Sequence, residues 1–345
     1  MGQHFYNKHW INAFRTVFEL CKVTADESTI VLTEQGGRLD NPALAQAALT
    51  EMGIDFKHLA LPFSAAASGP IIRSTGASMA LQGQSEAVAQ LCDATFIVDL
   101  TIEGLMHASE TQSILASGAR ILNISNEHPD TLARLVPVPG DKEKVRAAVS
   151  RCKAASRMRV ISPAGSDLNV DLDGAACVGV WGWTDRPGTL AHWPGGLVVC
   201  FPGARSVNGT LVMAPGDMNL TFKRYIESAI TLTIEDDFIV EISGEGADAR
   251  LMREYLKGFE EPDAYATSHV GWGLNSRARY EALTMYDKSD TNGTELRALA
   301  GNFLYSTGSN EFADRFTRGH FDLPILNCDI LLDGEPEVIS GQVVK

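Results

Sequence analysis

The chain has 345 residues, of which 29 are Lys or Arg and 43 are Asp or Glu, so its formal net charge is −14. Proteins that hold nucleic acid or anionic membranes by charge present basic stripes, whereas no basic run here is longer than a pair. No stretch approaches the roughly 20 apolar residues that a membrane span requires. We therefore expect a two-domain globular protein whose partners are small molecules, with neither nucleic acid nor membrane.

The cysteines and the N-terminus both indicate a cytoplasmic protein. The first ten residues are polar and lack the apolar core of a secretory signal. Six cysteines are scattered without a C-x-x-C pair, mostly inside apolar strings, which is typical of reduced core residues: Cys21, Cys92, Cys152, Cys177, Cys200 and Cys328. A disulfide scaffold and a thiolate zinc site are therefore excluded.

Helical and strand-like patterns alternate over the first 140 residues. An amphipathic stretch at 11–23 precedes a β-branched strand at 29–33, and a helix is expected to open at Asn41 with Pro42 as its first helical residue. Further apolar runs separated by helical stretches are expected to be strands at 56–61, 95–98 and 120–124, with helices at 84–92 and 109–117. No G-x-G-x-x-G follows the first strand, so nucleotide binding is not expected. The pattern predicts a Rossmann-like parallel α/β domain over residues 1–157, closed by a connecting helix at 141–157.

Short strands dominate the remainder of the sequence. Strands are expected at 159–161, 168–171, 196–201 and 209–213. Two alternating runs around Glu235, Asp236 and Asp237 predict a hairpin within 229–242, and one helix is expected at 249–259. Residues 158–345 are therefore predicted to form a β-rich domain.

Four of the eight histidines have informative neighbours. Because thiolates are excluded, a metal in this chain would be held by His and carboxylate. His320 and Asp322 are two residues apart, so in an extended strand both side chains project from one face, although such pairs are often solvated surface residues. His269 lies in a glycine-flanked Ser-His-Val-Gly-Trp-Gly string, and His192 precedes Trp-Pro-Gly-Gly, where a plain loop or turn residue explains each equally well. His107 follows the strand ending at Leu100, at the edge where parallel sheets place ligands.

Taken together, these strings resemble the 2,5-dihydroxypyridine 5,6-dioxygenases of nicotinate degradation. The resemblance extends into the first domain through Leu105-Met106-His107 and 133–137, so it covers most of the chain. It is carried by the segments His192-Trp193-Pro194, 268–274, 301–308, 320–324 and 327–330.

That family is related to the aminopeptidase T-like leucyl aminopeptidases, which hold two metals with glutamates, histidines and an aspartate. Where those peptidases have metal-binding residues, this chain has Leu197, His269 and Leu304, and only the final His-x-Asp is kept. The resemblance thus implies one Fe(II) held by His269, His320 and Asp322, the two-histidine, one-carboxylate set of non-haem oxygenases.

The resemblance implies extradiol-type opening of 2,5-dihydroxypyridine by O₂, giving N-formylmaleamate, in a homo-oligomer with the site between domains or between subunits. His192 is expected to be the base that takes the substrate's hydroxyl proton, and His107 to contact the ring substituents. Ser306 and Thr307 are expected as polar contacts, and Met106 and Leu304 as apolar walls.

Three alternatives remain at this point. Another hydroxylated pyridine is the first, since a few pocket side chains decide the substrate. An aminopeptidase-like metallohydrolase would need two metals, and the missing glutamates count against it. A non-catalytic small-molecule binder would keep the pocket without needing a His-x-Asp pair.

Overall fold

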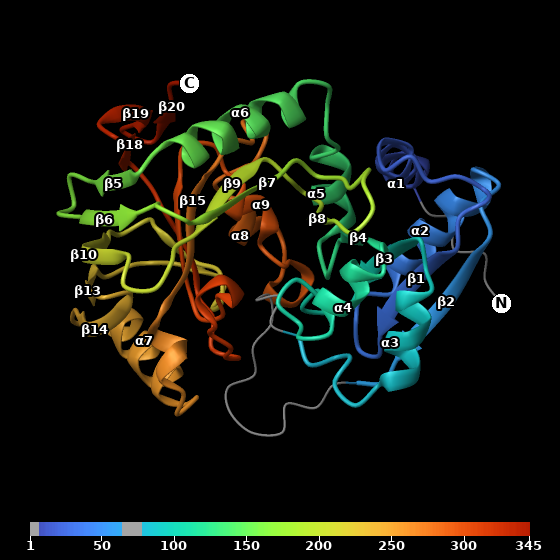
Figure 1. Cartoon of the computed structure of the whole chain (residues 1–345), viewed down its shortest axis with the longest axis horizontal. Coiled ribbons are helices and arrows are strands. Elements are labelled where there is room, and N and C mark those ends of the chain that lie inside the picture. The colour runs from blue at the N-terminus through green and yellow to red at the C-terminus, as the bar shows by residue number, and fades with distance from the viewer. Residues whose placement is uncertain (1–6, 64–77) are drawn as a thin grey trace.

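The structure is a computed structural model that describes residues 7–63 and 78–345 (Figure 1). Residues 1–6 of the polar N-terminal stretch, in which no secretory signal was expected, lie outside the described residues. Among the residues described, no helix is both long and apolar enough to cross a membrane. The chain forms two halves that lie side by side in Figure 1, the first mostly blue to teal and the second running from green through yellow to red.

The first half contains a five-stranded parallel sheet in the order β2-β1-β3-β4-β8. All six residues of β1 are buried, which agrees with the β-branched run that predicted this strand. The strands are β1 (Thr29–Glu34), β2 (Phe56–Leu61), β3 (Phe96–Leu100), β4 (Arg120–Asn123) and β8 (Leu190–His192). The parallel sheet predicted from the sequence is therefore confirmed.

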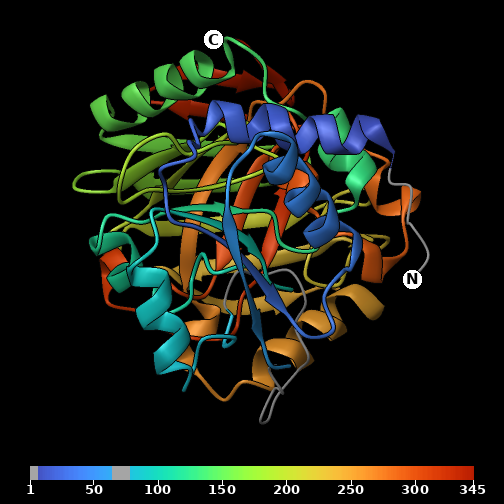
Figure 2. The same ribbon diagram turned by 90° about the vertical axis from the view of Figure 1, so that its right-hand side faces the viewer.

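Helices cover both faces of this sheet, as Figures 1 and 2 show. One face packs against α1 (Lys8–Leu20), α2 (Asp40–Glu51) and α5 (Pro129–Arg134), and the other against α3 (Ser85–Cys92) and α4 (Thr111–Ala116). The prediction that Pro42 is the first residue of its helix was wrong, because α2 begins at Asp40 and Pro42 is its third residue. Proline is tolerated there because the N–H groups of the first turn have no partner within the helix.

Strand β8 corrects the sequence-based reading of His192. This segment was assigned to the β-rich half, with a turn as one possibility for His192, yet Leu190–His192 pairs in parallel with β4 and extends the first sheet. A strand of three residues is too short to show a period, so only the partner strand reveals it. The strand places His192 beside Asn123, at the carboxyl edge of the parallel sheet.

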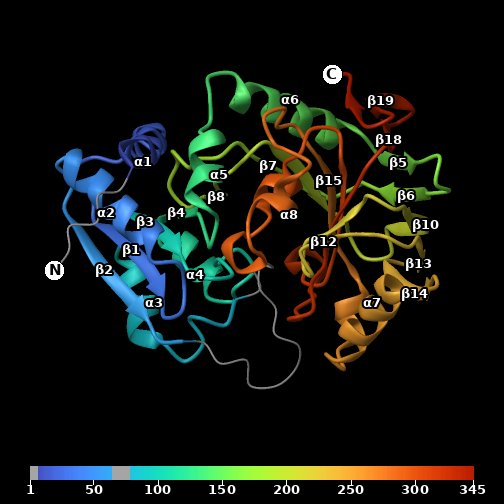
Figure 3. The ribbon, with the colours of Figure 1, turned by 180° about the vertical axis from the view of Figure 1, so that it is seen from behind.

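The second half contains two antiparallel sheets and a two-stranded ribbon (Figure 3). The larger sheet has the order β14-β13-β10-β6-β5-β18-β19-β20, and the hairpin predicted around 235–237 is its β13 and β14. Its strands are β5 (Arg157–Ile161), β6 (Asp167–Asp171), β10 (Val207–Met213), β13 (Ile230–Glu235), β14 (Phe238–Ser243), β18 (Asp329–Leu332), β19 (Glu335–Ile339) and β20 (Gln342–Val343).

The smaller sheet has the order β17-β16-β15-β9-β7 and lies nearer the first half. Its strands are β7 (Ala176–Val180), β9 (Leu197–Phe201), β15 (Thr267–Gly273), β16 (Phe303–Thr307) and β17 (Asp322–Ile325), and the ribbon is β11 (Met218–Asn219) with β12 (Arg224–Tyr225). The larger and the smaller antiparallel sheets together enclose the main apolar core of this half. Its helices are α7 (Ala247–Lys257), α8 (Ala282–Met285) and α9 (Thr294–Arg297), with short 3-10 turns at 262–265, 288–290 and 311–313.

Helix α6 (Asp141–Ala154) connects the two halves and packs on β7 and β9. It was predicted to continue to 157, but residues from Arg157 onward already belong to β5. All six cysteines are free, and five of them are buried, as expected of reduced core residues.

Candidate active site between the two halves

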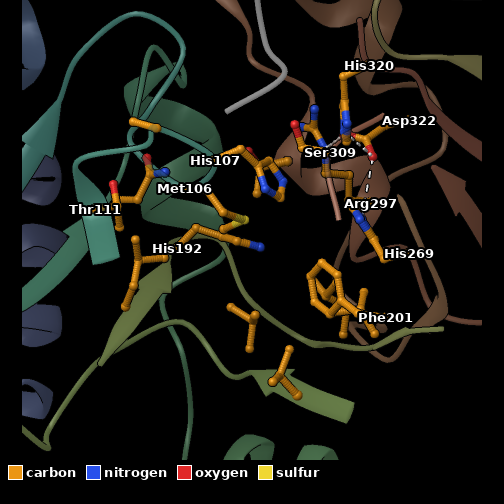
Figure 4. A pocket seen from close by; sticks show the side chains of 18 of the residues that line it. Met106, His107, Thr111, His192, Phe201, His269, Arg297, Ser309, His320 and Asp322 are labelled. Carbon is orange, nitrogen blue, oxygen red and sulfur yellow. Dashed lines mark hydrogen bonds and ion pairs between the residues drawn. The ribbon is translucent and has the colours of Figure 1, made fainter. Parts of the chain in front are cut away.

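A cavity of about 290 Å³ lies where the two halves meet (Figure 4). Side chains after β3, at the ends of β4 and β8, and on the smaller antiparallel sheet all contribute to it. Of the nine residues predicted for the site, seven line this cavity: Met106, His107, His192, His269, Leu304, His320 and Asp322. The cavity thus lies between the two halves, and a site between domains was one of the two locations that the sequence left open.

Buried carboxylates at the end of the parallel sheet shape the loop that carries Met106 and His107. Asp99 accepts hydrogen bonds from the backbone N–H groups of Thr101 (3.0 Å) and Leu105 (2.8 Å), and burial raises its pKa to about 6. Glu34 of β1 accepts a further bond from Ile102 N–H at 3.1 Å. The loop after β3 is thus held by the sheet beneath it.

Gly104 allows this loop to turn tightly against the end of β4. Its φ is +80°, and a Cβ there would lie 2.4 Å from Asn123 Nδ2 and 2.6 Å from Ser125 Oγ. We expect Gly104→Ala to lower the free energy of unfolding by about 1–3 kcal/mol, measured by urea denaturation. Gly118→Ala is the matched control, because Gly118 also has a positive φ (+98°) but no atom within 4 Å of the added Cβ. Equal losses in the two variants would show that Gly104 is needed for its backbone angle alone.

His192 reaches the cavity from the end of β8. Its Nδ1 lies 2.6 Å from the carbonyl oxygen of Pro194. A carbonyl can only accept, so Nδ1 carries the proton and Nε2 keeps a lone pair. Burial lowers the pKa of His192 to about 4, so the ring is neutral near pH 7. Figure 4 shows this ring extending into the cavity.

His269 lies on β15, beside a bulge that shifts the register between Thr267 and His269, so the alternative that it is a plain loop residue is wrong. Its Nδ1 is 3.0 Å from Ser268 Oγ, which itself donates to the carbonyl oxygen of Ser309. Because the serine proton is used on Ser309, the imidazole Nδ1 must be the donor, and Nε2 is left with a free lone pair. Burial lowers the pKa of His269 to about 3.

Asp322 is the centre of the polar cluster. Its Oδ1 accepts a hydrogen bond from Ser306 Oγ at 2.5 Å and lies 3.2 Å from His320 Nε2 and 3.8 Å from His269 Nε2. Its Oδ2 accepts from Arg297 Nε at 2.5 Å. Burial would raise the pKa of Asp322, but Arg297 and His320 outweigh it and hold the pKa well below its usual value. The carboxylate is therefore ionised.

His107 completes the cluster from the first half. Its ring centre lies 5.3 Å from that of His320 and 6.1 Å from that of His269. Burial, followed by the neighbouring His320 and His269, holds the pKa of His107 well below its usual value. All these side chains belong to one chain, so no second subunit is needed to bring His107 to the others.

This arrangement predicts the result of mixing two inactive variants. Chains carrying His107→Ala and chains carrying His269→Ala are expected not to restore activity together, because each cavity draws both histidines from the same chain. The measurement is turnover after subunit exchange, with exchange verified by mixed-mass oligomers. Recovered activity would show a site shared between subunits.

The cavity wall away from the histidines is apolar. Met106 and Leu304 contribute to it as expected, together with Leu197, Val199 and Phe201 of β9. Such a surface suits the face of a small planar ring.

Two predicted substrate contacts lie elsewhere. Ser306 and Thr307 are buried in β16 and do not line the cavity. Ser306 instead holds Asp322, and Thr307 Oγ1 accepts from Phe321 N–H at 3.1 Å. Both hydroxyl groups therefore form hydrogen bonds within the protein, to groups on or next to the neighbouring strand β17.

The residue types at His269, His320 and Asp322 suit a single metal ion. Two atoms that are each about 2.1 Å from one ion lie about 3–4 Å apart, and His320 Nε2 and His269 Nε2 stand at such distances from Asp322 Oδ1. A metal-bound histidine usually donates its other N–H, as His269 does to Ser268. As the side chains lie, however, no three His, Cys, Asp or Glu within residues 7–63 and 78–345 are grouped so that they could hold a metal. The three residues thus suit a metal by their chemistry, and their side chains would have to move before all three could bind one ion.

Arg297 is the main cavity residue that the sequence did not indicate. It lies at the end of α9, and its guanidinium pairs with Asp322 from 25 residues away. No local motif surrounds it, and a lone arginine on a short helix has no distinctive pattern. Only the folded contact identifies it.

Comparisons with known proteins agree over nearly the whole chain. The family described as 2,5-dihydroxypyridine 5,6-dioxygenase (NicX) matches residues 9–345. The chain is 37% identical over 342 residues to 2,5-dihydroxypyridine 5,6-dioxygenase of Pseudomonas putida, covering 98% of this chain and 97% of that protein.

Two solved structures share the fold. A 2,5-dihydroxypyridine dioxygenase structure from Pseudomonas putida KT2440 superposes with a TM-score of 0.89 at 36% identity, covering 97% of this chain and 96% of the other. Wild-type AmpT from Thermus thermophilus has a TM-score of 0.65 at 14% identity, covering 98% and 99%, which shows a common fold alone. The chain belongs to the 2,5-dihydroxypyridine 5,6-dioxygenase family.

Proposed function

We propose that this protein is an Fe(II)-dependent extradiol-type dioxygenase that opens 2,5-dihydroxypyridine between carbons 5 and 6 and yields N-formylmaleamate. The observation that carries the proposal is the convergence of His269, His320 and Asp322 on one side of the cavity, with His107 and His192 beside them. Membership of the family supports the reaction class and the substrate. A role in nicotinate degradation, in the cytoplasm and as a homo-oligomer, belongs to the same proposal.

His269, His320 and Asp322 would hold the iron. When bound there, Fe(II) would supply open coordination positions and redox chemistry with O₂, which a set of two imidazoles and one carboxylate supports. His269 supplies a neutral nitrogen near pH 7, since burial lowers its pKa to about 3. Asp322 supplies the single negative charge.

His192 would accept the hydroxyl proton of the substrate. Its Nε2 has a lone pair and its ring is neutral near pH 7, since burial lowers its pKa to about 4. His107, also neutral, would hydrogen-bond the oxygen substituents of the ring. Met106 and Leu304 would pack on the ring face and exclude water from it.

The test combines iron loading with O₂ uptake. Metal-free protein is loaded anaerobically with Fe(II) and then given O₂ with a panel of hydroxypyridines. We expect uptake of one O₂ per 2,5-dihydroxypyridine, and both atoms of ¹⁸O₂ in the product, because the substrate and O₂ together have the composition of N-formylmaleamate. Faster turnover of a trihydroxypyridine would change the substrate while keeping the reaction.

Two other outcomes would favour the remaining alternatives. Hydrolysis of amino-acid amides by protein that holds two metals per chain would indicate a metallohydrolase. Tight binding of a hydroxypyridine without O₂ uptake in iron-loaded protein would indicate a binding protein.

A further inference from the structure

A buried carboxylate of the first half holds a segment of the second. Glu127, in the loop after β4, is fully buried. Its Oε1 accepts from Thr294 N–H at 2.6 Å, and its Oε2 accepts from Asn292 N–H and Thr291 Oγ1, both at 3.3 Å. All three partners donate, so both side-chain atoms at position 127 must be hydrogen-bond acceptors, as the two oxygens of a carboxylate are.

The segment that Glu127 holds leads directly to Arg297. It continues through Gly293, whose φ is +89°, into α9. Arg297 donates back to the segment through Nη1, to Asn292 Oδ1 at 3.2 Å and to its carbonyl oxygen at 3.4 Å. At the other end of α9, Asn302 Nδ2 donates to the carbonyl oxygen of Leu296 at 2.7 Å. The short helix is therefore fixed at both ends.

Arg297 in turn fixes the carboxylate of Asp322. Arg297 Nε donates a hydrogen bond to Oδ2, and Ser306 Oγ donates one to Oδ1. These two hydrogen bonds fix the plane of the carboxylate. Asp322 Oδ1 lies 3.8 Å from His269 Nε2 and 3.2 Å from His320 Nε2. A change of a few tenths of an ångström at α9 would rotate the oxygen that these two imidazoles approach.

We propose that Glu127 is a positioning residue that orients Asp322 across the boundary between the two halves, acting through residues 291–294 and Arg297. This role for Glu127 rests on the proposed function in one respect, namely that Asp322 holds the metal. The contacts run from the loop after β4, in the half that carries His107, to the carboxylate in the half that carries His269. Glu127 thereby fixes the position of His107 and His192, in the first half, relative to His269 and His320, in the second.

The first experiment measures Co²⁺ binding to the metal-free, full-length protein by titration and visible spectroscopy. In Glu127→Gln the amide NH₂ faces at least one N–H donor, so the segment shifts, and we expect Co²⁺ affinity to fall by about 10–100-fold, the usual cost of losing a supporting contact. The control is Asp141→Asn, the same carboxylate-to-amide change at another contact between the halves, where Asp141 accepts from Arg277 Nη2 at 2.8 Å. Neither of these residues lines the cavity, and Asp141→Asn is expected to bind Co²⁺ like the parent.

A double-mutant cycle tests whether Glu127 acts through Arg297. If it does, Glu127→Gln should add little to the loss of Co²⁺ affinity already caused by Arg297→Met. Additive losses, or parental affinity in folded Glu127→Gln, would overturn the proposal. Should Glu127→Gln fail to fold, Thr291→Val removes a single donor to Glu127 and should weaken Co²⁺ binding in the same direction, by less.

Hydrogen exchange gives a second measurement that needs no metal. The amides of residues 292–297 should exchange faster in Glu127→Gln than in Asp141→Asn, because two of these amides donate to Glu127. Unchanged exchange would overturn the proposal even if the parent bound no Co²⁺. Absence of Co²⁺ binding in the parent would instead count against the proposed metal site.

Discussion

Replacing His320 with alanine is expected to abolish metal retention and turnover while leaving the fold in place. His320 is buried, and its Nε2 lies 3.2 Å from Asp322 Oδ1, which His269 Nε2 also approaches. Losing a ligand should weaken iron binding by more than the roughly 100-fold that a lost supporting contact costs. Metal analysis after dialysis should find about one iron per chain in the parent and almost none in the variant.

His58→Ala is the matched control for this variant. His58 lies on β2, where its Nε2 bonds to Thr33 Oγ1 at 2.9 Å, and it does not line the cavity. It should retain iron and activity. Activity in folded His320→Ala would show that the site is misplaced, and a second tightly held metal in the parent would favour the two-metal hydrolase.

Replacing His192 with alanine should lower the turnover number by about 10²–10⁴, the range for losing general acid–base help, while iron still binds. The reason is that His192 offers an unprotonated Nε2 to the cavity, whereas His269 and His320 face Asp322. Affinity for the substrate should change less than turnover. Steady-state kinetics and metal analysis of the same preparation measure both effects.

His192→Asn separates proton transfer from the local turn. Its amide NH₂ can still donate to the carbonyl of Pro194, as Nδ1 of His192 does, but it leaves no base in the position of Nε2. A variant nearly as active as the parent would show that His192 only stabilises the turn.

The pH profile provides an independent check on His192. Burial lowers its pKa to about 4, so kcat/KM of the parent should fall as the pH drops through that value and the lone pair becomes protonated. The alanine variant should lack this limb. An unchanged limb in an active variant would end the assignment.

Helices and strands could be predicted from the sequence where burial of one face or of the whole element leaves a recognisable pattern of apolar residues. The run at 29–33 is β1, and the alternating runs around Asp236 are β13 and β14. Strand β8 was missed because three residues carry no period, and β7 (Ala176–Val180) because its partly exposed pattern, interrupted by Gly179, does not alternate cleanly. In both cases pairing with a distant strand decides the structure.

The site was predictable to the extent that its residues stand in distinctive strings. His192, His269 and His320 each have such neighbours, and all three line the cavity. Arg297 and Glu127 could not be found in this way, because their contacts are set by the fold: Glu127 and Thr294 are 167 residues apart. Ser306 was expected to contact the substrate because it lies in a string that resembles the family, whereas it pairs with Asp322 across β16 and β17 and its hydroxyl donates to that carboxylate.

Strand β8 also determines how the polypeptide could be divided. The chain leaves the parallel sheet after β4, forms three strands of the other half, returns for Leu190–His192, and departs again. A fragment ending at residue 157 would therefore lack its terminal strand and expose the edge of β4, where buried Ile121 and Leu122 pair with β8. Such an edge invites intermolecular pairing, so we expect this fragment to aggregate on its own. Two separate crossings also connect the halves covalently near His192, which restricts hinge motion at the residue that would accept the proton.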